Sequence, residues 1–200
     1  IGQRVQTSAL GAALWLQQWE LTHVAMTGAN LNRDGNHHPN IPGFYGTYRT
    51  SDGGVIMLAQ VMDQEGWDSF CIFADVLELS LDPRFQTPGR RLGEGITKED
   101  TIELRGILKT AFAQKTMGQW VDFLYTQPEI IWERVRDWKE VLEDGQNFAN
   151  GYLTKINVPG AGETLTVGNL IALSETPGSE KGNPPELGEA NEGVLSGLGF

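Results

Sequence analysis

The spacing of apolar residues along the chain predicts several helices joined by loops and short strands. Apolar side chains recur at helical intervals from residue 4 to residue 27, and Gly28 is a suitable residue to end that helix. The same periodicity predicts helices at 63–77, 98–114, 120–124, 138–142, 146–150 and 189–198. Thr116 and Gln119 have the spacing of a capping box before the 120–124 segment, and Pro128 follows it as a terminator.

Short runs of β-forming residues lie between these helices. Residues 48–50 and 55–59 flank Ser51-Asp52-Gly53-Gly54, a sequence that favours the tight turn of a hairpin. A single strand is expected at 130–135, and a second hairpin at 152–158 and 165–167. A large parallel sheet would need several buried strands alternating with helices, and the pattern does not contain them. The sequence therefore predicts an α/β protein that is of the α+β kind within this chain.

Composition narrows the classes of partner. The 200 residues are enough to bury a sizeable core, and 15 Lys and Arg against 26 Asp and Glu give a net charge of −11. Nucleic acids and anionic lipid surfaces both attract clustered positive charge. The only dense basic cluster, Arg84, Arg90 and Arg91, is too small to offset this acidity. We therefore expect neither a nucleic-acid partner nor a membrane partner.

Cys71 is the only cysteine, so no disulfide can form within the chain. Its apolar helical surroundings favour a small buried side chain over a nucleophile. No signal peptide is recognisable and no apolar stretch is long enough to span a bilayer, which fits a reducing cytoplasm. The chain starts at Ile1, without Met, on residues that already read as a helix. We expect it to be part of a longer protein.

The most distinctive segment is the polar loop that precedes the first hairpin. Residues 35–46 read Gly-Asn-His-His-Pro-Asn-Ile-Pro-Gly-Phe-Tyr-Gly, where prolines restrict the backbone and glycines permit close approach to another molecule. Core formation does not require so specific a string, and we interpret the loop as a binding surface. Adjacent residues on an extended segment point apart, so His37 and His38 are not expected to share a metal ion.

No catalytic machinery is evident from the residues themselves. The candidate carboxylates are Asp34, Asp52, Glu133 and Asp144, and no pair of them has the spacing of a general acid and base. Asp52 belongs to a turn, and Asp144 lies near a helix end. A P-loop and a Gly-x-Ser-x-Gly nucleophile motif are both absent, and the Gly160-Ala161-Gly162 segment is a hairpin turn rather than a dinucleotide fingerprint.

Short motifs follow one another along nearly the whole chain. They are Gly2-Gln3-Arg4-Val5 with Ser8, Gly35-Asn36 with His38-Pro39-Asn40-Ile41, Tyr48 with Thr50 and Asp52-Gly53, Asp82-Pro83-Arg84-Phe85, Thr116 with Trp120, Val141-Leu142 with Asp144, Gln146 and Gly151, Leu173-Ser174 with Thr176-Pro177-Gly178, and Leu187-Gly188-Glu189 with Leu195 and Leu198-Gly199. Each motif is weak alone. Their order and spacing resemble the C-terminal half of the family III CoA-transferases, the family of formyl-CoA transferase and crotonobetainyl-CoA:carnitine CoA-transferase.

The resemblance implies an enzyme that moves coenzyme A between an acyl-CoA thioester and a carboxylic acid. In this family a catalytic aspartate forms a mixed anhydride with the acyl group and then an aspartyl-CoA thioester, so the carboxylate is the nucleophile. The coenzyme A thioester is a substrate, and no permanently bound cofactor is expected. Family members are interlocked dimers with a Rossmann-like larger domain and a smaller α+β domain. We therefore expect a homodimer, or pairing with a separate N-terminal half.

The resemblance also implies a domain division and a site. Residues 1–30 would be a helix of the larger domain or leading from it, residues 31–155 the smaller α+β domain, and residues 156–200 a return to the larger domain, which is mostly absent. The family's aspartate precedes the first motif, so no catalytic residue is expected in this chain, and the chain alone is expected to be inactive. The expected lid and substrate-binding residues are Gly35, Asn36, His37, His38, Pro39, Gly43, Tyr45 and Gly46, with Ser8 and Ala9 near the acyl pocket. We expect Gly43→Ala or Pro39→Ala to lower turnover more than stability.

Two other interpretations stay open on sequence grounds. Some relatives racemise 2-methylacyl-CoA thioesters by proton transfer, with acid and base groups in place of the nucleophile. Alternatively, the chain is a non-catalytic subunit that supplies a lid and a scaffold to a separate catalytic chain. The acyl group and the acid are not identified, because the pocket that selects them lies mostly outside this chain.

Overall fold

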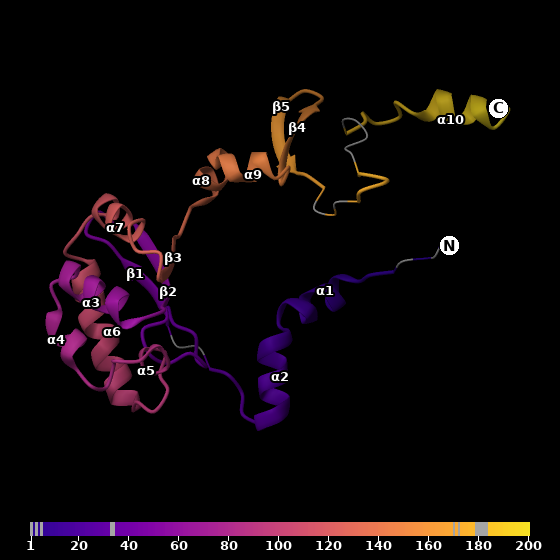
Figure 1. The fold of residues 1–200 in the computed structure, drawn as a ribbon. Helices are drawn as coiled ribbons and strands as arrows, with labels where there is room; N and C mark the ends of the chain where they lie inside the picture. Colours follow the sequence, from indigo (N-terminus) through magenta and orange to yellow (C-terminus); the bar gives the residue numbers. More distant parts are fainter. Residues whose placement is uncertain are drawn as a thin grey trace. The chain divides into compact units, whose positions relative to one another are not determined.

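The protein, studied as a computed structural model, is described at residues 2, 4, 6–32, 35–169, 171, 173–178 and 184–200. Gln3 and Val5 of the first motif, and the candidate carboxylate Asp34, lie outside the described residues. Contacts within the chain define two compact units, Ile1–Val135 and Arg136–Phe200 (Figure 1). The three-part division expected from the resemblance rests on a different criterion and stays a prediction.

The N-terminal segment forms two helices where the sequence predicts one. Helix α1 covers Ala9–Leu16 and helix α2 covers Gln18–Thr27. The break falls at Gln17, whose side-chain amide donates a hydrogen bond to the carbonyl of Ala13. That carbonyl is the one the regular helical bond of Gln17 would use, so the side chain competes with the backbone. The predicted stop at Gly28 is confirmed by its left-handed φ of 70°.

The first unit contains a three-stranded antiparallel sheet in the order β1-β2-β3. Its strands are β1 (Gly46–Arg49), β2 (Val55–Val61) and β3 (Ile130–Arg134). The predicted hairpin is confirmed, and its turn is closed by the Thr50 N–H, which donates to the Gly54 carbonyl. Strand β3, predicted from its sequence as a single strand, pairs with the other edge of β2, with a register shift between Leu58 and Gln60.

Five helices follow or interrupt the strands of the first unit. They are α3 (Gln64–Phe73), α4 (Leu77–Leu81), α5 (Pro88–Arg91), α6 (Lys98–Phe112) and α7 (Met117–Leu124). The sequence predicts α3, α6 and α7, and the capping box of Thr116 and Gln119 is confirmed. It misses α4 and α5 because segments of 5 and 4 residues are too short to display a helical repeat.

Helices α3 and α6 lie on one side of the sheet, against β2 and β1 respectively (Figure 1). Phe70, Phe112 and Trp120 pack there with ring centroids 4.0–6.0 Å apart. The indole N–H groups of Trp67 and Trp120 donate to backbone carbonyls, so these buried donors are paired. Among the described residues, every buried hydrophobic side chain falls between residues 44 and 130. The core therefore belongs to the first unit and supports the loop that enters β1.

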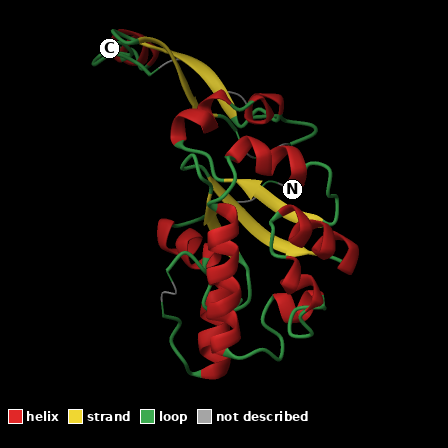
Figure 2. Ribbon diagram, turned by 90° about the vertical axis from the view of Figure 1, so that its left-hand side faces the viewer, coloured by secondary structure: helices red, strands yellow, loops and turns green. Residues whose placement is uncertain are grey.

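The second unit is built from short elements. They are α8 (Trp138–Glu143), α9 (Gly145–Ala149), β4 (Leu153–Val158), β5 (Gly162–Val167) and α10 (Asn191–Gly197). Strands β4 and β5 form the predicted second hairpin, and no described side chain of this unit is buried. Figure 2 shows the mixture of helices and short strands, which confirms the predicted α+β architecture. Within the described residues, no helix is both long and apolar enough to cross a bilayer.

Candidate functional site

Loop 35–46 connects the first helices to β1 and contains eight of the ten predicted site residues. Its first part is open: Gly35, Asn36 and Pro39 are exposed. An isolated bridge between His37 and Gly46 folds the loop back on itself. The loop is therefore a closed turn of chain with an exposed first part, placed directly before the central sheet.

His37 holds the two ends of this loop together. Its Nδ1 donates to the Tyr45 carbonyl at 3.0 Å, and its ring meets Tyr48 edge-on with centroids 5.9 Å apart. A side chain at Gly46 would overlap the His37 ring, so glycine permits this approach. Tyr48 is buried, and this burial raises the pKa of its phenol. Its hydroxyl donates a hydrogen bond to the Phe44 carbonyl.

His38 connects the loop to helix α2. Its ring lies against Trp19 with centroids 4.6 Å apart, and its Nε2 is 3.6 Å from a carboxylate oxygen of Glu20. Its Nδ1 accepts the Asn40 N–H at 3.1 Å, so the neutral ring carries its proton on Nε2. The neighbouring His37 instead carries its proton on Nδ1. The two rings have separate partners, and in the described part of the chain no group of His, Cys, Asp and Glu residues could hold a metal ion.

The second part of the loop is anchored to the core. Gly43 is buried with a φ of 40°, and a side chain there would overlap the Arg91 carbonyl oxygen. That same oxygen accepts the Phe44 N–H at 3.0 Å. From α6, Arg105 donates to three successive loop carbonyls, 41–43, at 2.7–3.2 Å. The loop therefore has a fixed half and an open half.

This division changes the expectation for one of the two loop substitutions. Because Gly43 lies in the fixed half, Gly43→Ala is expected to cost stability first rather than turnover. Pro39 is exposed in the open half and lines a pocket. We therefore still expect Pro39→Ala to lower turnover more than stability.

Arg91 is a structural arginine at the base of the loop. Its guanidinium is completely buried, lies 5.2 Å from the centre of the Trp67 ring, and donates to the carbonyls of Val61, Asp63 and Phe85 at 3.0–3.1 Å. Burial lowers its pKa to about 10, so the group is still charged at neutral pH. It ties the end of β2 and the start of α3 to the segment before α5.

Arg84 is paired rather than free. It contacts Asp82, Asp100 and Glu103 at 2.6–2.8 Å. Hydrogen bonds, first from Thr97 and then from Arg84, lower the pKa of Asp100 to about 2, and the Arg84 bonds also lower the pKa of Asp82 and of Glu103. The basic cluster seen in the sequence is therefore no cationic surface, since one member is buried and another is neutralised. The Asp82-Pro83-Arg84-Phe85 motif has a structural role.

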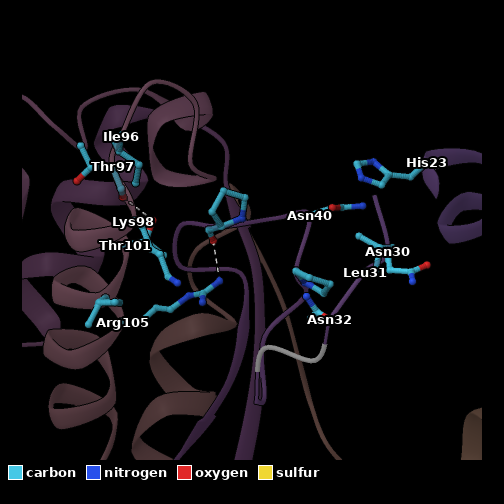
Figure 3. Close-up of a pocket in the computed structure, with 13 residues that line it drawn as sticks. His23, Asn30, Leu31, Asn32, Asn40, Ile96, Thr97, Lys98, Thr101 and Arg105 are labelled. Carbon is cyan, nitrogen blue, oxygen red and sulfur yellow. Dashed lines mark hydrogen bonds between the residues drawn. The ribbon is translucent and has the colours of Figure 1, made fainter. Parts of the chain in front are cut away.

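A pocket of about 630 Å³ lies beside the loop, within the first unit. Its lining residues come from α2 and the chain that follows it, from the loop, and from α6 with the residues before it: His23, Asn30, Leu31, Asn32, Pro39, Asn40, Pro42, Ile96, Thr97, Lys98, Thr101, Ile102 and Arg105. In Figure 3 the side chains of Lys98 and Arg105 lie on one side, and those of Asn32 and Asn40 on the other. The pocket thus brings loop residues together with residues that were not predicted from the sequence as site residues.

Sequence reasoning missed the α6 wall of this pocket. Lys98, Thr101, Ile102 and Arg105 follow one another at intervals of three, one and three residues, which places them on one helical face. That spacing was visible in the sequence as a mixed basic and polar stripe on an otherwise amphipathic helix. Nothing in the sequence indicated that the stripe faces loop 35–46.

The two site residues predicted outside the loop lie at the start of α1. Ser8 is the N-cap of that helix and accepts the Gly11 N–H at 3.0 Å, while Ala9 is its first residue. Both are exposed, and neither lines the pocket. Their expected position near an acyl group stays a prediction.

Two of the candidate carboxylates have structural partners. Asp52 accepts the Thr50 hydroxyl at 2.6 Å and the Met117 N–H at 3.0 Å, and the first of these bonds is the main cause of its lowered pKa. Asp144 caps α9 and lies 3.2 Å from Arg136. Cys71 is buried as predicted, and burial raises the pKa of its thiol to about 12. None of these three groups has the surroundings of an activated nucleophile.

The fold has a counterpart among solved structures. The structure matches that of a CaiB/BaiF family protein from Brucella suis with a TM-score of 0.69 and 21% sequence identity, covering 94% of this chain and 45% of that one. At this level of identity the match establishes the fold alone.

The sequence then identifies the family. The sequence model of CoA-transferase family III matches residues 1–191 of the chain. The chain therefore belongs to this family, as its motifs predict. It is 24% identical over its whole length to (R)-2-hydroxy-4-methylpentanoate CoA-transferase of Clostridioides difficile, covering 47% of that protein. It is 28% identical over 64% of its length to formyl-CoA:oxalate CoA-transferase of Afipia carboxidovorans, covering 28% of that protein. The chain thus spans less than half the length of either relative.

Proposed function

We propose that this chain is part of an enzyme that transfers coenzyme A between an acyl-CoA thioester and a carboxylic acid. Membership of CoA-transferase family III supports this reaction, as do relatives that are themselves named CoA-transferases. None of these relatives is named as a racemase, so we prefer transfer to proton abstraction. A homodimer, or a complex with a separate chain carrying the remaining half, is part of the proposal.

The proposed reaction uses an aspartate outside this chain. Its carboxylate attacks the acyl-CoA carbonyl and the coenzyme A thiolate leaves, which gives a mixed anhydride. The thiolate then attacks the aspartyl carbonyl and the donor acid leaves, which gives the aspartyl-CoA thioester. The acceptor carboxylate reverses both steps and restores the aspartate. Anhydride and thioester intermediates are both open to hydrolysis, so the site must exclude water while they exist.

The observation that carries the role of this chain is the division of loop 35–46 into a fixed half and an open half. Arg105 and the Arg91 carbonyl fix residues 41–44 to α5 and α6. The open half, with Asn36 and Pro39, is exposed on the same unit as the pocket. A loop that combines an anchored segment with exposed residues suits a cover over a reacting centre. We assign loop 35–46 that role.

The proposal is tested on the complete protein that contains this chain. The expected result is exchange of coenzyme A between an acyl-CoA and a free acid, with a hydroxylamine-sensitive enzyme thioester seen by intact-mass analysis. Pro39→Ala should lower kcat with little change in the urea midpoint. Absence of exchange with every donor tested would overturn the proposal. Exchange of the α-proton with deuterated solvent, without transfer, would instead identify a racemase. Activity that appears only with a second, co-purifying chain would identify a non-catalytic subunit.

A further inference from the structure

The pocket beside loop 35–46 has an unusual lining for an acidic protein. The chain carries a net charge of −11, yet no Asp or Glu lines the pocket among the described residues. Its polar side chains are three amides, two hydroxyls, one imidazole and two cations: Asn30, Asn32, Asn40, Thr97, Thr101, His23, Lys98 and Arg105. A concave surface with this lining concentrates positive potential and attracts an anion.

The ammonium group of Lys98 is available to a ligand. Within the described part of the chain, Lys98 has no ion-pair partner, although it begins a helix that also carries acidic residues. Two of those acids, Asp100 and Glu103, are held by Arg84 instead, and Glu99 is exposed and does not line the pocket. Two acids of the same helix therefore compensate another cation, and Lys98 lines the pocket without an ion pair to a described residue.

A second donor on the opposite wall lacks a partner. The Nδ2 of Asn40 is buried and donates no hydrogen bond to any described residue, which costs free energy until a ligand or water supplies an acceptor oxygen. Arg105 adds charge to the helix wall while its donors hold the loop carbonyls in place. Donors thus occur on both sides of the pocket.

Apolar side chains complete the pocket. Leu31, Ile96 and Ile102 line it together with Pro39 and Pro42, so the ligand should combine an anionic head with an apolar body. We propose that the pocket binds an organic carboxylate of this kind, with the carboxylate at Lys98 and the apolar body against these side chains. The inference rests on the proposed function, because it assigns the pocket to the carboxylic acid of the transfer reaction.

Direct binding tests this inference on the complete protein, with hexanoate as the probe. Calorimetry should detect hexanoate binding that weakens at least fivefold in Lys98→Gln and weakens further as salt is raised. The matched control is Lys109→Gln, which removes the same charge from an exposed site in the last turn of α6, outside the pocket lining. Hexanamide, with the same apolar body and no charge, should bind at least fivefold more weakly than hexanoate.

Three outcomes would overturn the inference: equal losses in the two lysine variants, equal binding of hexanamide and hexanoate, or inorganic phosphate binding as tightly as hexanoate. The last result would assign the pocket to phosphate groups, as carried by coenzyme A. Binding is measured without turnover, so hexanoate binding in a protein that fails to exchange coenzyme A would reject the proposed function and keep the pocket assignment. In an active enzyme, Lys98→Gln should raise KM for the acid and leave KM for the acyl-CoA unchanged.

Discussion

Gly43 has a left-handed backbone and no space for a side chain. The contributions of these two features to the cost of Gly43→Ala in unfolding free energy can be separated. Gly95 also has a positive φ, 67°, but open space where a side chain would be. Gly95→Ala should therefore cost only the conformational penalty, about 1 kcal/mol. Gly43→Ala should cost at least about 3 kcal/mol, since the Arg91 backbone must also move. Urea denaturation of both variants measures the difference, and equal costs would show that the Arg91 contact yields without strain.

The three carboxylates around Arg84 make stability depend on pH. Their folded-state pKa values are lowered, to about 2 for Asp100. A lowered pKa contributes stability above the unfolded value of about 4, and this contribution is lost as pH falls through the folded value. We expect the unfolding free energy to fall between about pH 5 and pH 2, and Arg84→Gln to flatten this decline. All of these groups are at least partly exposed, so salt should weaken the effect.

Arg90→Gln is the matched control for Arg84→Gln. Arg90 lies nearby in α5 and donates to the Pro83 carbonyl. Its removal should leave the pH dependence of the unfolding free energy unchanged. A profile that flattened equally in both variants would show that general charge, rather than the Arg84 network, causes the decline.

At the scale of elements, the contact between α2 and loop 35–46 includes an aromatic pair beside the approach of Glu20 to His38. The Trp19 ring lies against the His38 ring in a tilted arrangement, and the Nδ1 of His38 accepts the Asn40 N–H. Trp19→Ala should release the His38 ring and accelerate hydrogen exchange at the Asn40 amide by roughly tenfold, whereas Trp19→Phe should preserve most of the protection. Trp15→Ala, in α1, is the control, and NMR exchange rates are the measurement. Unchanged protection in Trp19→Ala would show that the loop holds Asn40 without α2.

The elements also show what sequence patterns can and cannot reveal. Helices α3, α6 and α7 and both hairpins were predictable because periodicity, caps and turn residues are local signals. The break at Gln17 was not, because it depends on a side chain that competes for a single carbonyl. Pairing of β3 with β2 joins segments about 70 residues apart, and a strand pattern does not specify its partner.

The candidate site was predictable in part for a similar reason. The composition of loop 35–46 marks it as unusual, and the resemblance assigns its residues a role. The α6 wall with Lys98 and Arg105 was missed, since a basic stripe on a helix usually faces solvent. The burial of Arg91 was also unexpected, because an arginine in a polar connection gives no sign that carbonyls from three segments surround it.

At the scale of the whole molecule, the two compact units should differ sharply in their ability to fold alone. The buried side chains lie in the first unit, and none lies in the described part of the second. Residues 1–135 expressed alone should keep the near-UV circular dichroism of their packed tryptophans. Residues 136–200 alone should lack a cooperative thermal transition, because an isolated hairpin with short helices buries too little apolar surface. A cooperative transition in residues 136–200 would contradict this division.

The anchoring of Gly43 against the Arg91 backbone also constrains how sequences with this fold can diverge. A side chain at position 43 requires α5 to shift, so this position should vary only together with a rearrangement of the neighbouring helix. The exposed positions 35, 36 and 39 carry no such coupling. If the proposed function holds, new acid preferences should therefore arise, in natural lineages and in laboratory libraries alike, by exchange of residues on the open half of the loop while the buried glycine is inherited unchanged.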